Sequence, residues 1–337
     1  MPGTSQDTDR NGRNRNSSNT SANPAGLASL DKAFIATPLV PSGGRLADGY
    51  RTCPANPDNG VEPEEAHMPG RPRRAAARLA AVLLAVLATT IAAPAAQAIY
   101  HGEDAPIGDY PFRVSLRLAN TPDSPRCGGT LIEPDIVLTA AHCVDRVPQG
   151  GIAVVVGADI PDWPDAPKVG TLGHQVPEGY DLTVDNRHDV AVLRLATPQT
   201  TPTVRLATAE PRAGARVVTS GWGCTNAPPV CEVMATRLQS SGQTVLRDKE
   251  CGPDVFWTIP TYYDATTICT KGTRDNSTIN RGDSGGPLLV RHGCGPYRQV
   301  GVTSLGSDST TKLYAGFTSI PVEADWVSRA IDSLRRS

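Results

Sequence analysis

The sequence predicts an all-β domain that ends in one helix. From residue 99 onward, short apolar or alternating runs recur between clusters of Gly, Pro and Asp, a pattern typical of strands joined by turns. No regular alternation of strands with helical segments indicates βαβ units, so the pattern favours a sandwich or barrel. The chain has 337 residues, of which 39% are hydrophobic, enough to bury a sizeable core.

Strands are expected where the runs are short and apolar or alternating. In chain order, these runs span residues 112–118, 130–138, 152–157, 189–195, 215–220, 287–290 and 299–304. The end of the chain predicts a helix, because apolar residues recur at three- and four-residue steps and Arg335 and Arg336 suit a helix C-terminus. The apolar positions of this helix are Val322, Trp326, Val327, Ala330, Ile331 and Leu334.

An export signal is predicted ahead of this domain. Residues 68–98 combine a basic start, an uncharged Ala/Leu/Val run and a small-residue ending, so we expect a signal peptide cleaved after Ala98. The alternative is a single membrane anchor, for which the run is only just long enough. Residues 1–67 are rich in Asn, Ser, Pro and Gly and lack periodicity. We expect this extension to be disordered, and translation to begin at Met68.

Composition bears on the possible partners. The formal net charge of -2 gives no reason to expect a nucleic-acid partner. The cysteines form no CxxC pair, so a zinc site is not indicated. We expect neither a metal nor a cofactor.

Three short motifs carry the candidate chemistry. Residues 280–287 read Asn-Arg-Gly-Asp-Ser-Gly-Gly-Pro, a glycine-rich turn around one Ser and one Asp. Residues 138–143 read Leu-Thr-Ala-Ala-His-Cys, and residues 187–193 read Arg-His-Asp-Val-Ala-Val-Leu. A Ser hydroxyl becomes a good nucleophile only when a base takes its proton and dipoles stabilise the oxyanion, so the Ser motif needs the His and the Asp.

In the order His, Asp, Ser, and with Cys-Gly-Gly-Thr-Leu at residues 127–131, these motifs resemble those of the trypsin/chymotrypsin family of serine proteases. The resemblance covers residues 99–337 and is specific, because separate motifs and cysteine pairs agree. It implies a secreted enzyme of bacterial type with two six-stranded antiparallel β-barrels (the chymotrypsin fold) and a C-terminal α-helix. The implied activity is that of a serine-type endopeptidase.

By this resemblance, each motif residue has a role. Ser284 would be the nucleophile, His142 the general base and then acid, and Asp189 the buried carboxylate that orients His142. The backbone N–H groups of Gly282 and Ser284 would form the oxyanion hole. His188, next to Asp189, could modulate that carboxylate.

Two alternatives compete with this interpretation. The Gly-Asp-Ser-Gly-Gly run also satisfies the G-x-S-x-G pattern of α/β-hydrolases, but there the acid and the His follow the Ser in an alternating α/β chain. Here the credible His142 and Asp189 precede Ser284. The second alternative is a catalytically inactive, protease-like binding protein. The retention of His142, Asp189 and Ser284 argues against it.

Asp283 is too close to Ser284 to act as its base. In the family, the Asp at this position pairs with the free ammonium of the mature N-terminus, which suggests an activation pair of Ile99 and Asp283. Ile99-Tyr-His-Gly matches the usual start of the mature chain in its first and fourth residues only. Signal cleavage after Ala98 would expose Ile99 directly, so we expect export itself to activate the enzyme.

The cysteines fit an exported member of the family. The resemblance implies disulfides between Cys127 and Cys143 and between Cys251 and Cys269. We expect Cys224 and Cys231 to form a third, local pair. Cys294 has no obvious partner in the sequence, since Cys53 lies before the signal.

The substrate pocket is where the chain departs most from the family. Thr278 stands at the position of the pocket floor, where trypsin-like members carry an Asp that binds Lys or Arg. A neutral floor favours an apolar or aromatic residue before the scissile bond, the P1 residue, over Lys or Arg. The remaining pocket positions are Ile279, Asn280, Arg281, Ser304, Leu305, Gly306 and Gly316. Asp275 or Asp308 reaching into the pocket would restore basic specificity.

The resemblance also implies partners and a location. Protein or peptide substrates are expected, with protein protease inhibitors as further candidate partners. We expect a secreted, extracellular monomer without stable membrane association after signal cleavage.

Overall fold

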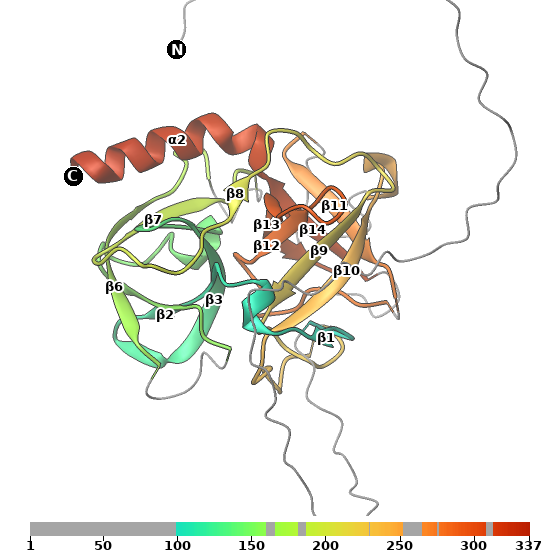
Figure 1. Cartoon of the computed structure of the whole chain (residues 1–337), viewed down its shortest axis with the longest axis horizontal. Helices are drawn as coiled ribbons and strands as arrows, with labels where there is room; N and C mark the ends of the chain where they lie inside the picture. The colour runs from blue at the N-terminus through green and yellow to red at the C-terminus, as the bar shows by residue number, and fades with distance from the viewer. Residues whose placement is uncertain are drawn as a thin grey trace, which may run out of the picture. The chain divides into compact units, whose positions relative to one another are not determined.

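The computed structural model describes residues 99–159, 166–180, 187–228, 230–251, 265–274, 276–307 and 313–337. Within these residues the chain forms two β-barrels and a C-terminal helix (Figure 1). The predicted extension 1–67 and signal peptide 68–98 lie outside the described residues, as do Asp275 and Asp308.

The first barrel is closed and contains six antiparallel strands in the order β2-β3-β4-β7-β6-β5. Its strands are β2 (Arg113–Leu118), β3 (Thr121–Glu133), β4 (Ile136–Thr139), β5 (Ile152–Val156), β6 (Lys168–Gln175) and β7 (Ala191–Leu195). The pairing of β2 with β5 closes the ring. One short 3-10 helix, η2 (Ala141–Cys143), follows β4 and carries His142.

The second barrel follows the order β10-β11-β14-β13-β12-β9 and is closed by the pairing of β10 with β9. Its strands are β9 (Arg216–Gly221), β10 (Gln239–Val245), β11 (Thr267–Gly272), β12 (Pro287–Val290), β13 (Arg298–Gly306) and β14 (Tyr314–Ser319). Two short strands extend it, β1 (Glu103–Asp104) beside β10 and β8 (Arg205–Leu206) beside β13. The remaining 3-10 helices are η1 (Ile107–Asp109) and η3 (Asp248–Glu250).

The predicted all-β fold of two six-stranded barrels is confirmed. The run expected at 130–138 divides into β3 and β4, because Pro134 and Asp135 form the turn between them. Several strands had no clear sequence signal. In β10, for example, the buried positions include Gln239, Ser241 and Gln243, so the inward face is polar and the usual apolar alternation is missing.

The C-terminal helix, α2 (Ile320–Arg336), lies along β7 and β6 of the first barrel (Figure 1). Its apolar stripe is as predicted except at its start. Val322 is exposed, and Glu323 takes the buried position instead. The stripe is displaced by one residue because Val322 fits the apolar step, whereas Glu323 is held inside by a hydrogen bond with His188 that the local sequence does not reveal.

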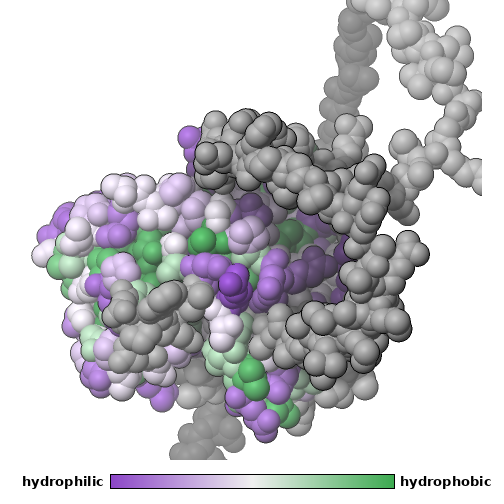
Figure 2. All heavy atoms as spheres, turned by 60° about the horizontal axis from the view of Figure 1, so that its bottom comes forward, coloured by the Kyte–Doolittle hydropathy of each residue, from purple (hydrophilic) through white to green (hydrophobic). Residues whose placement is uncertain are grey.

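Each barrel has its own apolar core. One cluster fills the first barrel and includes the inner face of α2, and a second cluster around Phe317 and Leu288 fills the other barrel. The face seen in Figure 2 carries a band of hydrophilic residues, with hydrophobic residues in small separate groups. In the part of the chain that the structure describes, no helix is long and apolar enough to cross a membrane.

Candidate active site

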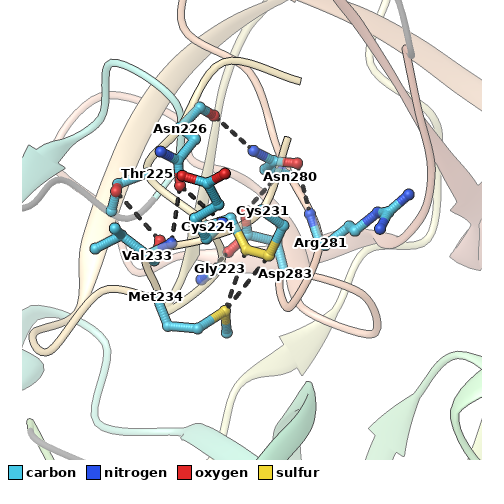
Figure 3. The surroundings of a disulfide bond; sticks show 11 residues. Gly223, Cys224, Thr225, Asn226, Cys231, Val233, Met234, Asn280, Arg281 and Asp283 are labelled. Carbon is cyan, nitrogen blue, oxygen red and sulfur yellow. Dashed lines mark hydrogen bonds between the residues drawn. A yellow bond between two sulfur atoms is a disulfide. The ribbon is translucent and has the colours of Figure 1, made fainter. Parts of the chain in front are cut away.

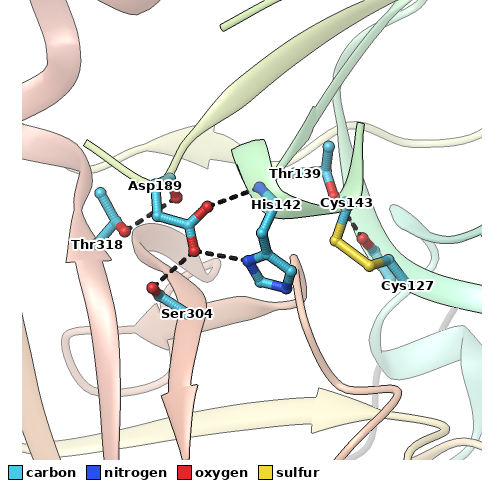
Figure 4. A network of polar contacts seen from close by, with 8 residues as sticks. Cys127, Thr139, His142, Cys143, Asp189, Ser304 and Thr318 are labelled. Carbon is cyan, nitrogen blue, oxygen red and sulfur yellow. Dashed lines mark hydrogen bonds and ion pairs between the residues drawn. A yellow bond between two sulfur atoms is a disulfide. The ribbon is translucent and has the colours of Figure 1, made fainter. Parts of the chain in front are cut away.

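His142 and Asp189 come from separate loops of the first barrel and meet side by side (Figure 4). His142 Nδ1 lies 2.7 Å from Asp189 Oδ2, and the backbone N–H of His142 donates to Asp189 Oδ1 at 3.0 Å. Two hydrogen bonds to one carboxylate fix both the position and the ring orientation of the histidine. The Nε2 atom is thereby left for a proton from another group.

Two residues of the second barrel also contact Asp189. The Ser304 hydroxyl donates to Asp189 Oδ2 at 2.7 Å, and the Thr318 hydroxyl donates to the Asp189 carbonyl oxygen at 2.9 Å. Asp189 is fully buried. The sequence placed Ser304 among the pocket residues only. Its hydrogen bond to Asp189 was not predicted, because it forms where the two barrels meet.

The pKa values of this pair shift as expected for an ion pair. Burial opposes the charged form of His142, but the charge of Asp189 and its hydrogen bond raise the pKa of His142 above 6.5. Burial likewise opposes ionisation of Asp189, and the contacts with His142 and Ser304 outweigh it, so the pKa of Asp189 is lowered. Asp189 therefore stays ionised and stabilises a protonated His142.

Ser284 lies half-buried in the turn that leads into β12. The backbone N–H of Gly128 donates to the Ser284 carbonyl oxygen at 2.7 Å. Gly128 adjoins Cys127, which is disulfide-bonded to Cys143, the neighbour of His142 (Figure 4). This chain of contacts ties the Ser turn to the His turn. Within the described residues, no hydrogen bond joins the Ser284 hydroxyl to the His142 ring.

Gly282 has a left-handed backbone, with φ of 94°. A Cβ built at this position would come 2.5 Å from Met234 Cε and 3.0 Å from the Gly223 Cα atom. Glycine is therefore required here both by the backbone conformation and by the space. A side chain at position 282 would therefore displace Met234 or the backbone of Gly223.

Asp283 is fully buried beneath this turn (Figure 3). Its Oδ1 accepts from the Gly223 N–H at 2.8 Å and its Oδ2 from the Asn280 N–H at 2.9 Å. Burial raises the pKa of Asp283 to about 6, because these bonds and the charge of Arg113 offset only part of the desolvation. The buried carboxylate is thus short of positive charge.

Ile99 is fully buried at the edge of the second barrel. Tyr100 forms a β-bridge with Thr278, whose N–H donates to the Tyr100 carbonyl oxygen at 3.0 Å. The start of the predicted mature chain therefore lies beside the segment that leads to Asp283. In this uncleaved chain the Ile99 nitrogen belongs to a peptide bond, and among the described residues no hydrogen bond joins it to Asp283.

The predicted pocket positions lie between residues 278–281 and β13. Thr278 is fully buried, and its hydroxyl lacks a hydrogen-bond partner among the described residues. A Cβ on Gly306 would lie 4.0 Å from Ile279 Cδ1, so these two positions face each other. The Leu305 side chain instead packs with Cys251 and Cys269, opposite Gly316.

Asn280 and Arg281 mark the outer side of this region (Figure 3). Asn280 Nδ2 donates to the Asn226 carbonyl oxygen at 2.8 Å, which ties residues 278–281 to the loop closed by Cys224 and Cys231. Arg281 is exposed, and its side chain points away from that disulfide.

The cysteine predictions are confirmed for all three pairs. The structure contains Cys127–Cys143, Cys224–Cys231 and Cys251–Cys269. Cys294, for which the sequence offered no obvious partner, is also disulfide-bonded. Cys127, His142 and Cys143 lie close enough to hold a metal ion, but both sulfurs are committed to a disulfide and supply no thiolate.

Comparisons with known proteins place this site in a family. The trypsin family model matches residues 99–327. A trypsin of Sarcophaga bullata is 31% identical over 242 residues, which cover 70% of this chain and 90% of that protein. A trypsin-like protease of Streptomyces glaucescens is 29% identical and covers 78% and 93%, and chymotrypsin-C of Bos taurus is 31% identical and covers 68% and 87%.

A solved structure supports the fold. Mouse neuropsin, described as a serine protease expressed in the limbic system, superposes with a TM-score of 0.58 at 22% identity, covering 69% of this chain and all of that one. Fold and site together define a chymotrypsin-fold hydrolase. The chain belongs to the trypsin family and is a serine-type endopeptidase that acts on protein or peptide substrates.

Proposed function

We propose that this protein is a secreted endopeptidase in which Ser284, His142 and Asp189 form the catalytic triad. The observation that carries the proposal is the buried Asp189 carboxylate 2.7 Å from His142 Nδ1, with Ser304 as a second donor. This arrangement keeps Nδ1 protonated and presents Nε2 as a base.

In the proposed reaction, His142 Nε2 takes the Ser284 proton as Oγ attacks the substrate carbonyl carbon. The tetrahedral intermediate collapses when the imidazolium donates that proton to the leaving amine, which leaves an acyl-enzyme. A water molecule, activated by the same nitrogen, then releases the acid and regenerates Ser284. The backbone N–H groups of Gly282 and Ser284 stabilise the oxyanion at both stages.

Two observations support a role for Asp283 in activation. Its pKa of about 6 indicates that, in the uncleaved chain, the backbone hydrogen bonds and the charge of Arg113 together do not offset the desolvation of the buried carboxylate. Cleavage after Ala98 frees an ammonium on Ile99, whose neighbour Tyr100 is bridged to Thr278. The new ammonium would then pair with Asp283 and fix the turn that carries Gly282. Signal cleavage and activation would be one event.

The pocket residues favour an apolar or aromatic P1 residue. Thr278 offers a hydroxyl and no charge at the buried end, and Ile279 adds an apolar side chain that faces Gly306. Arg281, exposed beside the oxyanion turn, favours acidic groups elsewhere in the substrate. The protein is expected to act as a monomer, and protein protease inhibitors remain candidate partners.

A fluorophosphonate probe and a peptide library test the triad and the pocket together. The exported protein should form a covalent adduct at Ser284 and cleave after apolar or aromatic residues, whereas S284A should fold and do neither. A protease-like binding protein would give no adduct. Cleavage only after Lys or Arg would refute the proposed P1 preference while leaving the triad in place.

N-terminal sequencing of the exported protein tests the activation step. The expected first residue is Ile99, with full activity and no later processing. An exported form that carries residues ahead of Ile99 and gains activity on further cleavage would refute activation by export.

A further inference from the structure

Arg113 is a buried charge that the proposed reaction does not use. It lies at the start of β2, where Val114 and Leu116 face the barrel core and the alternation turns Arg113 outward, toward the second barrel. Its side chain is completely buried. Nη1 donates to the Gly129 carbonyl oxygen at 2.7 Å, and Nε and Nη2 have no hydrogen-bond partner among the described residues.

The guanidinium of Arg113 lies close to three segments next to the Ser turn, those that contain Gly128, Trp222 and Gly286. Arg113 Cζ lies 5.1 Å from the centre of the Trp222 ring, within reach of a cation–π interaction. Cβ atoms built on Gly128 and Gly286 would come 2.8 Å and 3.2 Å from Nη2, so both glycines leave room for the arginine.

Each of these segments also touches residues 283–284. The Gly128 N–H donates to the Ser284 carbonyl oxygen, and the Gly286 N–H donates to the Asp283 carbonyl oxygen at 2.9 Å. Trp222 precedes Gly223, whose N–H binds the Asp283 carboxylate. The guanidinium therefore lies underneath the turn, in contact with the groups that hold it.

Arg113 and Asp283 also act on each other electrostatically. Burial lowers the pKa of Arg113 to about 9, and the charge of Asp283 opposes that shift. Reciprocally, burial raises the pKa of Asp283, and Arg113 is the cation that opposes this increase. Both side chains are fully buried, and each charge favours the charged form of the other.

We infer that Arg113 is a positioning residue, a permanent internal countercharge that holds Asp283 and, through it, the Gly282–Ser284 turn. The inference rests on the proposed triad and oxyanion hole. Asp283 would thus be held by two cations in the mature enzyme, the Ile99 ammonium and Arg113. The first depends on cleavage, and the second is present in every form of the chain.

The same strand offers a matched control. Arg117 lies four residues further along β2, is equally buried, and donates to the Pro122 carbonyl oxygen at 3.1 Å. The interactions that shift the pKa of Asp283 include Arg113 and not Arg117. R113M and R117M each remove one buried guanidinium from β2, so the comparison isolates the effect of the Arg113 charge on Asp283.

The experiment is a double-mutant cycle on the exported protein produced from the full chain. The variants R113M, R113K, D283N, R113M/D283N and R117M are compared by their rate of fluorophosphonate labelling at Ser284. We expect R113M to slow labelling at least about tenfold, R113K to restore most of the rate, and R117M to stay within about twofold of the unmodified protein. On the D283N background, R113M should have no further effect.

Labelling of R113M at the unmodified rate would overturn the inference, as would an equal slowing by R113M with and without D283N. If R113M does not fold, the folding of R113M/D283N tests the inference instead. Removal of both charges should restore folding if the two charges are coupled. Failure of the double variant to fold would also overturn it. If the unmodified protein does not label at all, the proposed function fails, and denaturant unfolding of the same variants still reads the coupling between Arg113 and Asp283.

Discussion

At the scale of single residues, the site depends on one carboxylate with several donors. Asp189 accepts from His142 twice and from Ser304 once, and it is fully buried. Buried charge-assisted hydrogen bonds are stronger than exposed ones, and removing one leaves an unpaired acceptor. Small changes around Asp189 should therefore be visible in the chemistry of His142.

The pH dependence follows from the direction of the His142 shift. Since Asp189 raises the pKa of His142 above 6.5, the base is neutral only above that raised value, and activity is lost as pH falls through it. We expect kcat/KM between pH 5 and 9 to report a single ionisation above about 6.5. Replacing Ser304 with Ala should lower kcat/KM by roughly tenfold, because about 1 to 2 kcal/mol of a charged hydrogen bond is lost. A kcat/KM that does not fall as the pH is lowered would contradict the assignment of His142 as the base.

Gly282 gives a second prediction at this scale. G282A must adopt φ near 94° and place its Cβ against Gly223, so we expect a loss of about 1 to 2 kcal/mol in unfolding free energy. Displacement of its N–H should also lower kcat about a hundredfold. G293A is the control, since Gly293 also has positive φ, 58°, but open space around it. Comparable kcat values for the two variants would rule out an oxyanion role for Gly282.

At the scale of elements, the C-terminal helix is fastened next to the active site. Glu323 of α2 is buried, and its Oε1 lies 2.6 Å from Nδ1 of His188, the residue before Asp189. His188 has φ of 58°, an unfavourable value for a non-glycine residue, which indicates that its surroundings hold it there. The helix thus stabilises the strand entry that presents Asp189.

The strength of this attachment can be measured. E323A should reduce the unfolding free energy by about 1 to 2 kcal/mol, because the part-buried hydrogen bond between Glu323 and His188 is lost. V322A, at the exposed neighbouring position, should change it by less than about 0.5 kcal/mol. Denaturant unfolding of both variants makes the comparison, and equal effects would show that the contact contributes little.

At the scale of the whole molecule, the site is divided between the barrels. His142 and Asp189 belong to the first barrel, while Ser284, Ser304 and Thr318 belong to the second. The Thr130 hydroxyl of the first barrel also donates a hydrogen bond to Gln299 Oε1 of the second barrel, at 2.6 Å. Because neither barrel holds a complete set of these residues, the active geometry depends on their packing together.

Asp283 links the state of the N-terminus to overall stability. With a folded pKa of about 6 against 3.8, Asp283 binds its proton more tightly in the folded state, so its stabilisation is present below pH 3.8 and lost as pH rises through 6. In a form that keeps residues ahead of Ile99, the unfolding free energy should fall by roughly 3 kcal/mol as the pH rises through this range. In D283N this pH-dependent fall should be absent. Denaturant unfolding between pH 4 and 7 measures both.

Cleavage after Ala98 should reverse the sign of the effect of D283N on the unfolding free energy. In the mature form the Ile99 ammonium would pair with Asp283, so D283N should destabilise the protein by roughly 3 to 5 kcal/mol. The same unfolding measurement on the mature form provides the comparison. D283N effects of the same sign in both forms would contradict pairing of Asp283 with the N-terminus.

The sequence by itself predicted the all-β fold and the helix, because turn glycines and apolar runs are local patterns. The family resemblance implied the disulfides Cys127–Cys143 and Cys251–Cys269, which the structure contains. The sequence also supplied His142, Asp189 and Ser284 as candidates. It did not predict β10, whose buried Gln239, Ser241 and Gln243 satisfy each other or their neighbours only after the strands assemble.

Only the tertiary structure decided which residues meet. The contacts of Ser304 with Asp189, of Met234 with Gly282 and of Glu323 with His188 all join segments far apart in the chain. A buried polar or charged side chain gives no periodic signal, since its cost is offset by a specific partner rather than by an apolar face. The residues proposed to carry the chemistry could therefore be taken from motifs, while the residues that contact them could be identified only from the packed barrels.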